Sequence, residues 1–277
     1  MPEDMTLAAD VAELAPTRTW PQGGDRPVLA LHCSLAHSGA WSGLAERLNG
    51  VTLTGFDQPG HGRAADWDGR EDLHTVTTRT AIALAEQLGQ GAPIDLIGHS
   101  FGGTVALRVA LERPDLVRSL VLVEPVIFAA AHASEHPAYK PFRARHLLVA
   151  ETLRAEGKAA AAALFHADWG TGEPLADLPD RQRNYIIDRI SYIAAQNGAL
   201  LDDSAGLLAY LRLEAVGVPV LLVEGADSPA IIDAVQEELA RRLPQSRRLI
   251  VPGAGHMVPI THPDIVARAV QAHLDAC

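Results

Sequence analysis

The sequence predicts an α/β protein with a doubly wound, mostly parallel sheet and an inserted helical segment. Apolar runs of strand length alternate with amphipathic helical stretches, which is the pattern of parallel sheets covered by helices on both faces. One run turns directly into a helix through Gly98-His99-Ser100-Phe101-Gly102. The apolar runs expected to form strands are Val28–His32, Val51–Phe56, Ile94–Ile97, Ser119–Val123, Val218–Glu224 and Arg247–Val251.

The first part of the chain alternates strands and helices in order. Leu7–Trp20 alternates weakly and predicts one or two edge strands, and Gln22–Asp25 predicts a turn. Helices are expected from Trp41 to Leu48, over Thr75–Leu88 after the second strand, and over Thr104–Leu111 after the turn at Ser100. This order favours a sheet with helices on both faces.

The stretch from 126 to 213 breaks this alternation, because it contains no convincing strand. A loop of that length without secondary structure is improbable in a compact domain. We therefore expect a helical cap at 126–213, inserted into a core domain made of 1–125 and 214–277. The helices expected in the cap are around Phe142–Leu153, Ala155–Phe165, Arg181–Ala195 and Ala205–Leu211, and those after it are Ala230–Leu243 and Ile265–Leu274.

Composition narrows the classes of partner. The chain of 277 residues has a formal net charge of -11, which argues against a nucleic-acid or anionic-membrane partner. Two cysteines, Cys33 and Cys277, cannot form a disulfide framework. Met1–Asp10 lacks the apolar run of a signal peptide, and no stretch has the length of an uncharged membrane span. We expect a cytoplasmic protein, a monomer or homodimer, that acts on a small molecule.

The motif around Ser100 predicts a nucleophile. A sharp turn from strand to helix holds its middle residue in a strained conformation, and Gly98 and Gly102 allow the helix to approach the strand closely. Ser100 Oγ would then stand exposed at the carboxyl edge of the sheet, near the positive end of a helix. This strand–turn–helix context favours a nucleophile elbow over a chance glycine-rich loop.

Three further motifs accompany the elbow. They are His32-Cys33-Ser34 with Trp41, the loop Asp57–Gly62, and Gly253-Ala254-Gly255-His256-Met257. With the elbow, these motifs occur in the order that the α/β-hydrolase superfamily uses, and the chain resembles that superfamily over essentially its whole length. The resemblance implies an eight-stranded sheet, a cap inserted between strands six and seven, and an active site at the carboxyl edge of the sheet.

Ser100 needs a base and an acid partner. His256 is the candidate base, since its glycine-rich loop follows the last strand and can extend over the sheet edge. The acid should orient His256 and stabilise the imidazolium. The superfamily usually places it at the position held here by Ser228, with Asp227 one residue earlier. A second placement known in the superfamily corresponds to Glu124, which ends an otherwise apolar strand, and we favour Glu124 over Asp227.

The oxyanion requires two preorganised N–H donors. Phe101, directly after the nucleophile, is expected to supply one. The other is expected from Ser34, with Leu35 as the second choice, because Cys33 replaces the glycine that the superfamily usually has in this loop. Cys33 is interpreted as a packing residue. The loop that contains Asp57 and His61 is interpreted as structural.

The combined motifs predict a serine hydrolase that cleaves a carboxylic ester of a small or medium apolar substrate through an acyl-enzyme, without metal or cofactor. Lactonase, thioesterase or carbon–carbon bond hydrolase chemistry on the same triad remains open, as do acyl transfer and a non-catalytic ligand-binding protein of the same fold. The apolar cap residues that could line the pocket or form the core of the cap are Phe128, Phe142, Leu147, Leu164, Phe165, Trp169, Tyr185 and Tyr192.

Overall fold

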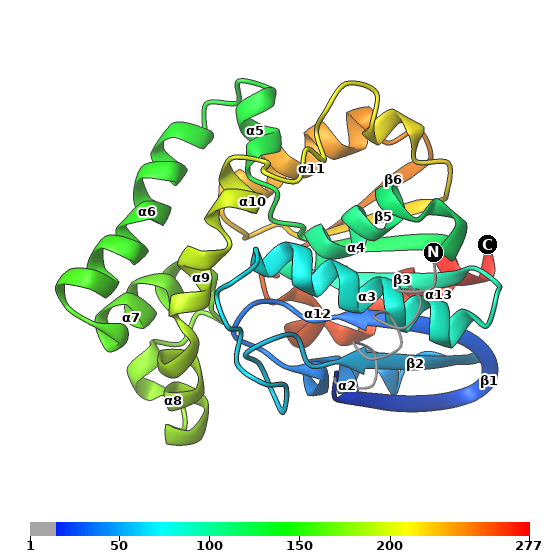
Figure 1. Cartoon of the computed structure of the whole chain (residues 1–277), viewed down its shortest axis with the longest axis horizontal. Helices are drawn as coiled ribbons and strands as arrows, with labels where there is room; N and C mark the ends of the chain where they lie inside the picture. Colours follow the sequence, from blue (N-terminus) through cyan, green and yellow to red (C-terminus); the bar gives the residue numbers. More distant parts are fainter. Residues whose placement is uncertain (1–14) are drawn as a thin grey trace.

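A computed structural model describes residues 15–277, and the part of the expected edge strand before residue 15 lies outside these residues, as does Met1–Asp10. A single sheet with strand order β2-β1-β3-β4-β5-β6 forms the centre of the molecule (Figure 1). The mostly parallel α/β fold predicted from the sequence is confirmed. The strands are β1 (Thr17–Leu31), β2 (Val51–Phe56), β3 (Ile94–His99), β4 (Val117–Val123), β5 (Val220–Gly225) and β6 (Ser246–Val251).

The sheet has six strands, so the expectation of eight is wrong for the described residues. The long strand β1 accounts for part of the difference, because both of its halves pair with β2. The first half pairs in falling order, from Thr17 opposite Phe56 to Gln22 opposite Val51, while the second half pairs in rising order and ends at Leu31. The first half is therefore an antiparallel edge segment that belongs to the same strand as the parallel second half.

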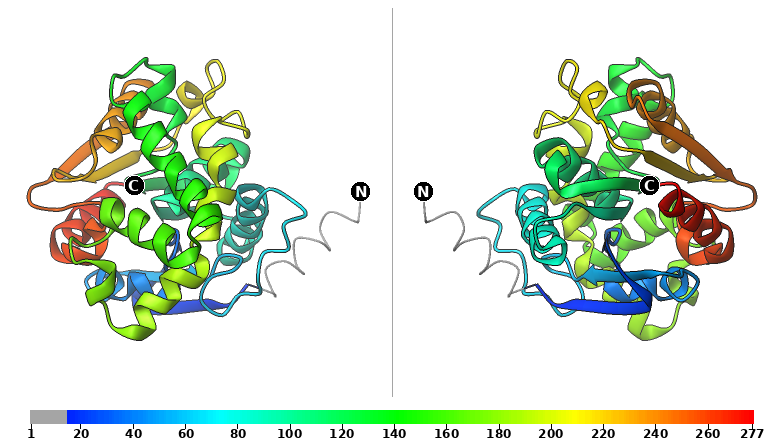
Figure 2. Two further views of the ribbon diagram at one scale, coloured as in Figure 1. Left: turned by 90° about the vertical axis from the view of Figure 1, so that its left-hand side faces the viewer. Right: turned by 90° about the vertical axis from the view of Figure 1, so that its right-hand side faces the viewer.

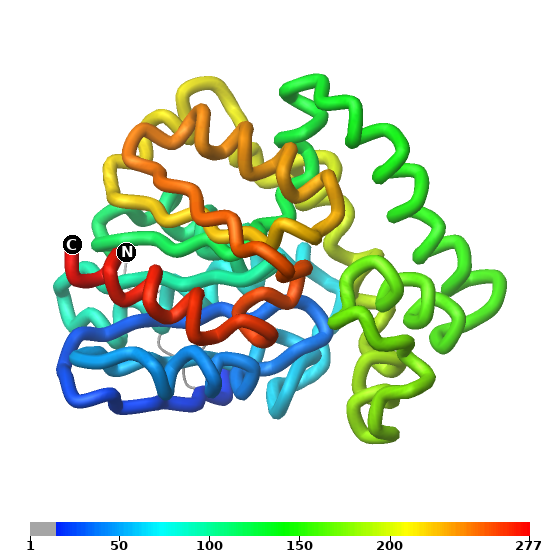
Figure 3. Tube along the Cα trace, turned by 180° about the vertical axis from the view of Figure 1, so that it is seen from behind, coloured from blue at the N-terminus to red at the C-terminus, as the bar shows by residue number. Residues whose placement is uncertain are grey.

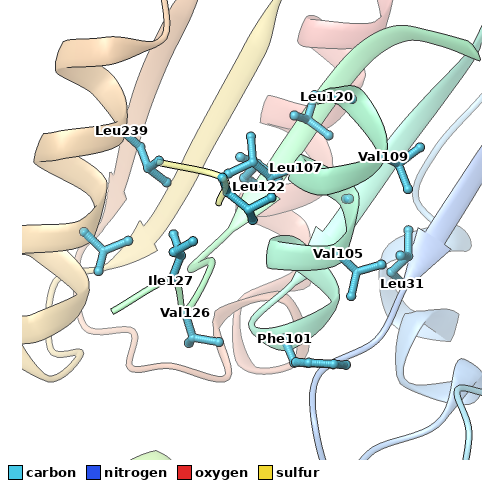
Figure 4. Packing of buried hydrophobic residues seen from close by; sticks show 14 of the residues in the cluster. Leu31, Phe101, Val105, Leu107, Val109, Leu120, Leu122, Val126, Ile127 and Leu239 are labelled. Atoms are coloured by element: carbon cyan, nitrogen blue, oxygen red, sulfur yellow. The ribbon is translucent and has the colours of Figure 1, made fainter. Parts of the chain in front are cut away.

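Helices cover both faces of the sheet, and alternate strand residues contribute to the two layers. In β1, Leu29 and Leu31 belong to the larger apolar cluster, whereas Val28 and Ala30 belong to the cluster on the other face. Figure 4 shows part of the larger cluster, including Leu122. Helices α3 (Leu73–Gly89), α4 (Phe101–Glu112) and α11 (Ala230–Arg242) pack in that cluster; α2 (Ser42–Ala45), α12 (Val258–Thr261) and α13 (Pro263–Asp275) pack in the other (Figures 1 and 3).

The segment 126–213 is helical and contains no strand. Its middle part, residues 139–195, lies beyond one end of the sheet, opposite the C-terminus (Figures 1 and 2). Among residues 15–277, no helix has both the length and the apolar character needed to cross a membrane. The helices of the segment are α5 (Ala129–Ala133), α6 (Tyr139–Ala155), α7 (Lys158–Trp169), α8 (Asp180–Arg189), α9 (Ser191–Ala195) and α10 (Asn197–Leu201); the short 3-10 helices of the chain are η1 (Ser38–Trp41), η2 (Pro114–Leu116), η3 (Leu175–Asp177) and η4 (Leu213–Ala215).

The middle of this segment has an apolar cluster of its own. Helices α6 to α9 bury residues such as Val149, Ala161 and Ile190 against one another. Both ends of the segment instead contribute to the main core, for example through Ile127 and Leu207. The helical segment therefore packs on the sheet domain at its two ends and through Tyr139 and Trp169, and its middle also has a cluster of its own.

Two helix predictions in this segment need correction. Ala205–Leu211 is a series of turns, because the Asp203 carboxylate accepts the N–H groups of Leu207 and Leu208 at 2.7 and 2.9 Å and so competes with helical bonding. The helix expected over Arg181–Ala195 is divided into α8 and α9 at residue 190.

Candidate active site

The carboxyl edge of the sheet brings three residues together that lie far apart in the sequence. Ser100 follows β3, Glu124 follows β4, and His256 lies on the loop after β6. In a parallel sheet the carboxyl ends of all strands meet at one edge, where binding sites of this fold class form. The helical segment 126–213 faces this edge (Figure 1).

Ser100 occupies a strained turn that only small neighbours permit. Its backbone has φ 55° and ψ −120°, and its N–H donates to Val123 O at 2.9 Å. A Cβ on Gly98 would lie 2.4 Å from Gly102 O, and a Cβ on Gly102 would lie 2.3 Å from Leu31 O. Both glycines are therefore required for the close approach of helix and strand, as the sequence motif predicted.

A continuous chain of hydrogen bonds joins the three side chains. His256 Nδ1 lies 2.6 Å from Glu124 Oε2, and His256 Nε2 lies 3.0 Å from Ser100 Oγ. The carboxylate can only accept when ionised, so Nδ1 carries the proton and Nε2 is free to accept the serine hydroxyl. All three side chains are buried.

Glu124 is held in place by further donors on its other oxygen. Oε1 accepts the Gly225 N–H at 2.7 Å and the Ser228 hydroxyl at 2.5 Å. Burial alone would raise the pKa of Glu124, but the hydrogen bond and charge of His256, together with these two donors, hold that pKa below its ordinary value. The carboxyl group therefore remains ionised beside the imidazole.

Asp227, the alternative acid, lies away from this chain. Its side chain is exposed, its N–H donates to Ala254 O at 2.9 Å, and its carboxylate has no hydrogen-bond partner among residues 15–277. The position at which the superfamily usually has the acid is thus occupied by Ser228, whose hydroxyl binds Glu124 instead.

His99, inside the elbow, binds the backbone of His256. Its Nε2 donates to His256 O at 2.9 Å, and the two rings lie 5.1 Å apart between centroids. Burial, with a contribution from the neighbouring His256, lowers the pKa of His99 to about 3. A neutral ring is thereby kept in contact with the loop that carries the base.

The two backbone N–H groups expected to bind an oxyanion belong to Phe101, which follows Ser100, and to Ser34, which lines the same cavity as Ser100. Phe101 is the first residue of α4, where helical N–H groups have no partner in the helix. Neither the Phe101 N–H nor the Ser34 N–H has an acceptor within the described part of the chain. The N–H of Leu35, the second choice, donates to His61 Nε2 at 3.1 Å and is therefore occupied.

The loops around the oxyanion donors are tied together by side chains. Asp57 Oδ1 accepts the Ser38 N–H at 2.8 Å, and Asp57 Oδ2 accepts the Arg63 N–H at 3.0 Å. Burial lowers the pKa of His61 to about 4, so its ring stays neutral and can accept from the oxyanion loop. These contacts agree with a structural role for Asp57 and His61. Burial raises the pKa of the Cys33 thiol to about 12, which agrees with a packing role.

A small cavity is lined by Ser100 and His256. The Trp169 ring closes it on one side, edge-on to His256 with the ring centroids 4.6 Å apart. No Lys, Arg, Asp or Glu is found among its described lining residues. These are Ser34, Ser100, Val126, Phe128, His146, Phe165, Trp169, Ile193, Gln196, Leu200 and His256.

A larger open groove adjoins the cavity. Ser34, Phe165 and Trp169 line both, so the two aromatic rings stand between the groove and the reacting groups. Of the apolar cap residues considered from sequence, Phe128 lines only the cavity and Tyr185 only the groove. The others, which line neither, are Phe142, Leu147, Leu164 and Tyr192.

Three polar residues of the site were not assigned from the sequence. The sequence shows Ser228 only as an uncharged residue at the usual acid position, and it does not indicate that the hydroxyl binds Glu124. His146 and Gln196 line the cavity from the helical segment. Gln196 follows the apolar stretch Ile193-Ala194-Ala195, where a buried amide is unusual, but no local pattern indicates its partner.

Comparison with known proteins identifies the family to which this fold belongs. The sequence model of the family described as alpha/beta hydrolase fold matches residues 26–263. The chain is 29% identical over 272 residues to "Lipase LipV" of Mycobacterium tuberculosis, with 95% of this chain and 98% of that protein covered. It is 30% identical over 265 residues to "Putative 2-succinyl-6-hydroxy-2,4-cyclohexadiene-1-carboxylate synthase" of Bacillus subtilis, with 89% of each chain covered.

Solved structures share the fold at lower identity. A thermophilic esterase from Thermogutta terrifontis superposes with a TM-score of 0.71 at 23% identity, covering 95% of this chain and 94% of that one. MenH from S. aureus superposes with a TM-score of 0.70 at 19% identity, covering 94% and 98%. From its sequence and its fold together, the chain belongs to the alpha/beta hydrolase family.

Proposed function

We propose that this protein is a serine hydrolase that cleaves a carboxylic ester of a small or medium substrate through an acyl-enzyme intermediate. The observation that carries the proposal is the unbroken hydrogen-bond chain from Glu124 through His256 to Ser100, which ends in an uncharged cavity. A nucleophile, its base and an orienting acid in this geometry are the requirements for acyl transfer.

Acylation follows from the protonation states of the chain. Ser100 Oγ attacks the ester carbonyl while His256 Nε2 takes its proton, and the new imidazolium is stabilised by the ionised Glu124. The N–H groups of Phe101 and Ser34 bind the oxyanion of the tetrahedral intermediate. His256 then gives its proton to the departing alcohol, and the acyl group remains on Ser100.

Deacylation repeats these steps with water. His256 Nε2 takes a proton from water, the hydroxide attacks the acyl carbon, and the same N–H groups bind the second oxyanion. Collapse of this intermediate releases the acid and returns the proton to Ser100. Two relatives whose names specify ester chemistry support this class of bond: the lipase described above, and "Esterase Rv0045c" of Mycobacterium tuberculosis at 27% identity over 274 residues.

The segment 126–213 serves in this proposal as a cap that selects the substrate. Its contribution to the cavity wall includes Phe128, Phe165, Trp169 and Ile193, so changes in the cap alter the pocket without altering the reacting groups. The two aromatic rings between cavity and groove would have to move apart to admit a substrate from the groove. The core domain, 1–125 and 214–277, carries the chemistry.

Covalent labelling and turnover test the proposal together. A fluorophosphonate should add once, at Ser100, as mapped by peptide mass spectrometry, and Ser100→Ala should lose both the label and hydrolysis of p-nitrophenyl butanoate by several orders of magnitude. Ser134→Ala is the matched control, since Ser134 is exposed and distant in sequence from the elbow.

If folded Ser100→Ala hydrolyses the ester within tenfold of the unchanged protein, Ser100 is not the nucleophile. If the unchanged protein binds the ester but neither releases p-nitrophenol nor takes up the label, the fold serves as a binding module instead.

A further inference from the structure

The helix side of the cavity contains a histidine nitrogen without a partner. His146 Nε2 lies 3.0 Å from Asn197 Oδ1, which can only accept, so Nε2 carries the proton. His146 Nδ1 is therefore a hydrogen-bond acceptor, and it has no partner within residues 15–277 although the side chain is 93% buried. Burial lowers the pKa of His146, which keeps the ring neutral.

The neighbouring glutamine has the complementary property. Gln196 Oε1 accepts the Ser34 hydroxyl at 2.8 Å, which directs the other end of the amide, Nε2, away from this contact. Gln196 Nε2 is a donor, and it too is buried without a partner among the described residues. Gln196 and Asn197 are consecutive at the junction of α9 and α10, so one short stretch fixes both the free donor and the orientation of His146.

One acceptor and one donor thus remain unmatched on two residues that line the cavity of Ser100. A buried polar atom without a partner costs free energy, and a binding site that leaves such atoms free is completed by the ligand that matches them. On the basis of the function proposed above, we propose that the substrate carries a hydroxyl group that donates to His146 Nδ1 and accepts from Gln196 Nε2.

Other common substituents fit this pair less well. A carboxylate cannot donate to Nδ1, and no Lys or Arg among the described lining residues would balance its charge. An ammonium group cannot accept from the Gln196 amide. An alkyl group leaves both atoms unpaired. A hydroxyl is the smallest neutral group that both donates and accepts.

The hydroxyl can belong to the acid or to the alcohol of the ester, and two series of substrates separate these sources. The first compares p-nitrophenyl esters of 2-hydroxybutanoic and 3-hydroxybutanoic acid with those of 2-methylbutanoic and 3-methylbutanoic acid. The second compares 2-hydroxypropyl butanoate with 2-methylpropyl butanoate. Each methyl group replaces the hydroxyl at nearly constant volume, and each rate is divided by that of uncatalysed hydrolysis to remove electronic effects.

We expect kcat/KM to favour the hydroxylated ester by about tenfold or more in at least one series, as two hydrogen bonds to buried partners allow. In His146→Phe and Gln196→Met this ratio should fall towards one, whatever happens to the absolute rates. The matched controls are His273→Phe and Gln236→Met. They remove a buried ring and a buried amide that also have an unpartnered atom, but that do not line the cavity, so the ratio should persist.

A ratio near one in both series of the unchanged protein overturns the inference, because a water molecule would then satisfy the two atoms equally well. A high ratio that persists in both cavity variants overturns it as well. Either result leaves the proposed function standing if the unhydroxylated esters are hydrolysed through Ser100. If no ester is hydrolysed, or if Ser100→Ala remains active, the proposed function itself fails.

Discussion

The two walls of the cavity differ in how completely their polar atoms are paired. On the sheet side, which we call the sheet wall, Glu124 accepts from His256, Gly225 and Ser228. His256 is in turn hydrogen-bonded to both Glu124 and Ser100. On the side of the helical segment 126–213, which we call the helix wall, His146 Nδ1 and Gln196 Nε2 have no partner within the described residues.

This difference suits the two walls to different tasks, the sheet wall to the reaction and the helix wall to the choice of substrate. A fully bonded chain is preorganised, so little reorganisation is needed when charge develops in the transition state. A wall with unmatched atoms acquires its partners only when the substrate is bound, and it therefore discriminates between substrates. Since the helix wall belongs to an inserted segment, the fold can change its substrate while it retains its reacting groups.

Glu124→Gln should interrupt the hydrogen-bond chain of the sheet wall and cause the largest loss of kcat. Gly225 and Ser228 both donate to the same oxygen of Glu124, so a glutamine would accept these bonds with its oxygen and turn its NH2 towards His256 Nδ1. That arrangement forces the proton of the ring onto Nε2, which then cannot accept from Ser100. We expect kcat on p-nitrophenyl butanoate to fall by about 10⁴.

Asp227→Asn is the matched control, because it removes one carboxylate charge from the adjacent turn at an exposed position. It should retain most of the activity. If Asp227→Asn loses as much as Glu124→Gln while both variants remain folded by circular dichroism, the orienting acid is Asp227 and the pairing of Glu124 with His256 is structural.

The apolar cluster that α6 to α9 share predicts that these helices open more easily than the sheet, although Tyr139 and Trp169 also pack in the main core. Ile190 is fully buried in that cluster, and Ile190→Ala should lower the free energy of opening of these helices by about 2–5 kcal/mol. Hydrogen exchange should accelerate in α6 to α9 and remain slow in β3 and β4. Leu122→Ala, in the core of the sheet, should instead accelerate exchange throughout the chain.

Equal acceleration in both regions of Ile190→Ala would mean that the segment and the sheet form one cooperative unit. The separation of a cap at 126–213 from the core domain would then have no energetic basis.

The residues of the sheet wall have signals in the sequence that the residues of the helix wall lack, for physical reasons. Parallel strands buried on both faces are continuous apolar runs, and the carboxyl ends of such strands necessarily meet at one edge. Ser100 and His256 follow from motifs at that edge. Glu124 was indicated as the acid because a carboxylate at the end of an apolar strand needs a partner.

The helix wall depends on contacts that have no local pattern. The partners of Gln196 and His146 are Ser34 and Asn197, and only the packing of the inserted segment determines which of their atoms remain free. The number of strands was overestimated because the resemblance implied a complete sheet, whereas both halves of β1 pair with the same neighbour. The turns after Asp203 replaced an expected helix through side-chain bonds that apolar periodicity does not reveal.

Ser228→Ala should lower kcat much less than Glu124→Gln does. Its hydroxyl is one of two donors to Glu124 Oε1, and the Gly225 N–H remains after the substitution. A hydrogen bond to a carboxylate stabilises the ionised form, so its loss raises the pKa of Glu124. We expect kcat to fall about tenfold and the acidic limb of its pH profile to move to higher pH, because ionised Glu124 is required over the whole cycle.

A purely structural role for Ser228 would lower the amount of folded protein without moving the pH profile, so the displaced limb distinguishes the two roles. Ser228→Thr keeps a hydroxyl at the same position and should restore most of the activity and the original profile. If Ser228→Ala keeps both its kcat and its profile, Gly225 alone is sufficient to hold Glu124. In that case the hydroxyl of Ser228 contributes nothing to holding the Glu124 carboxylate beside His256.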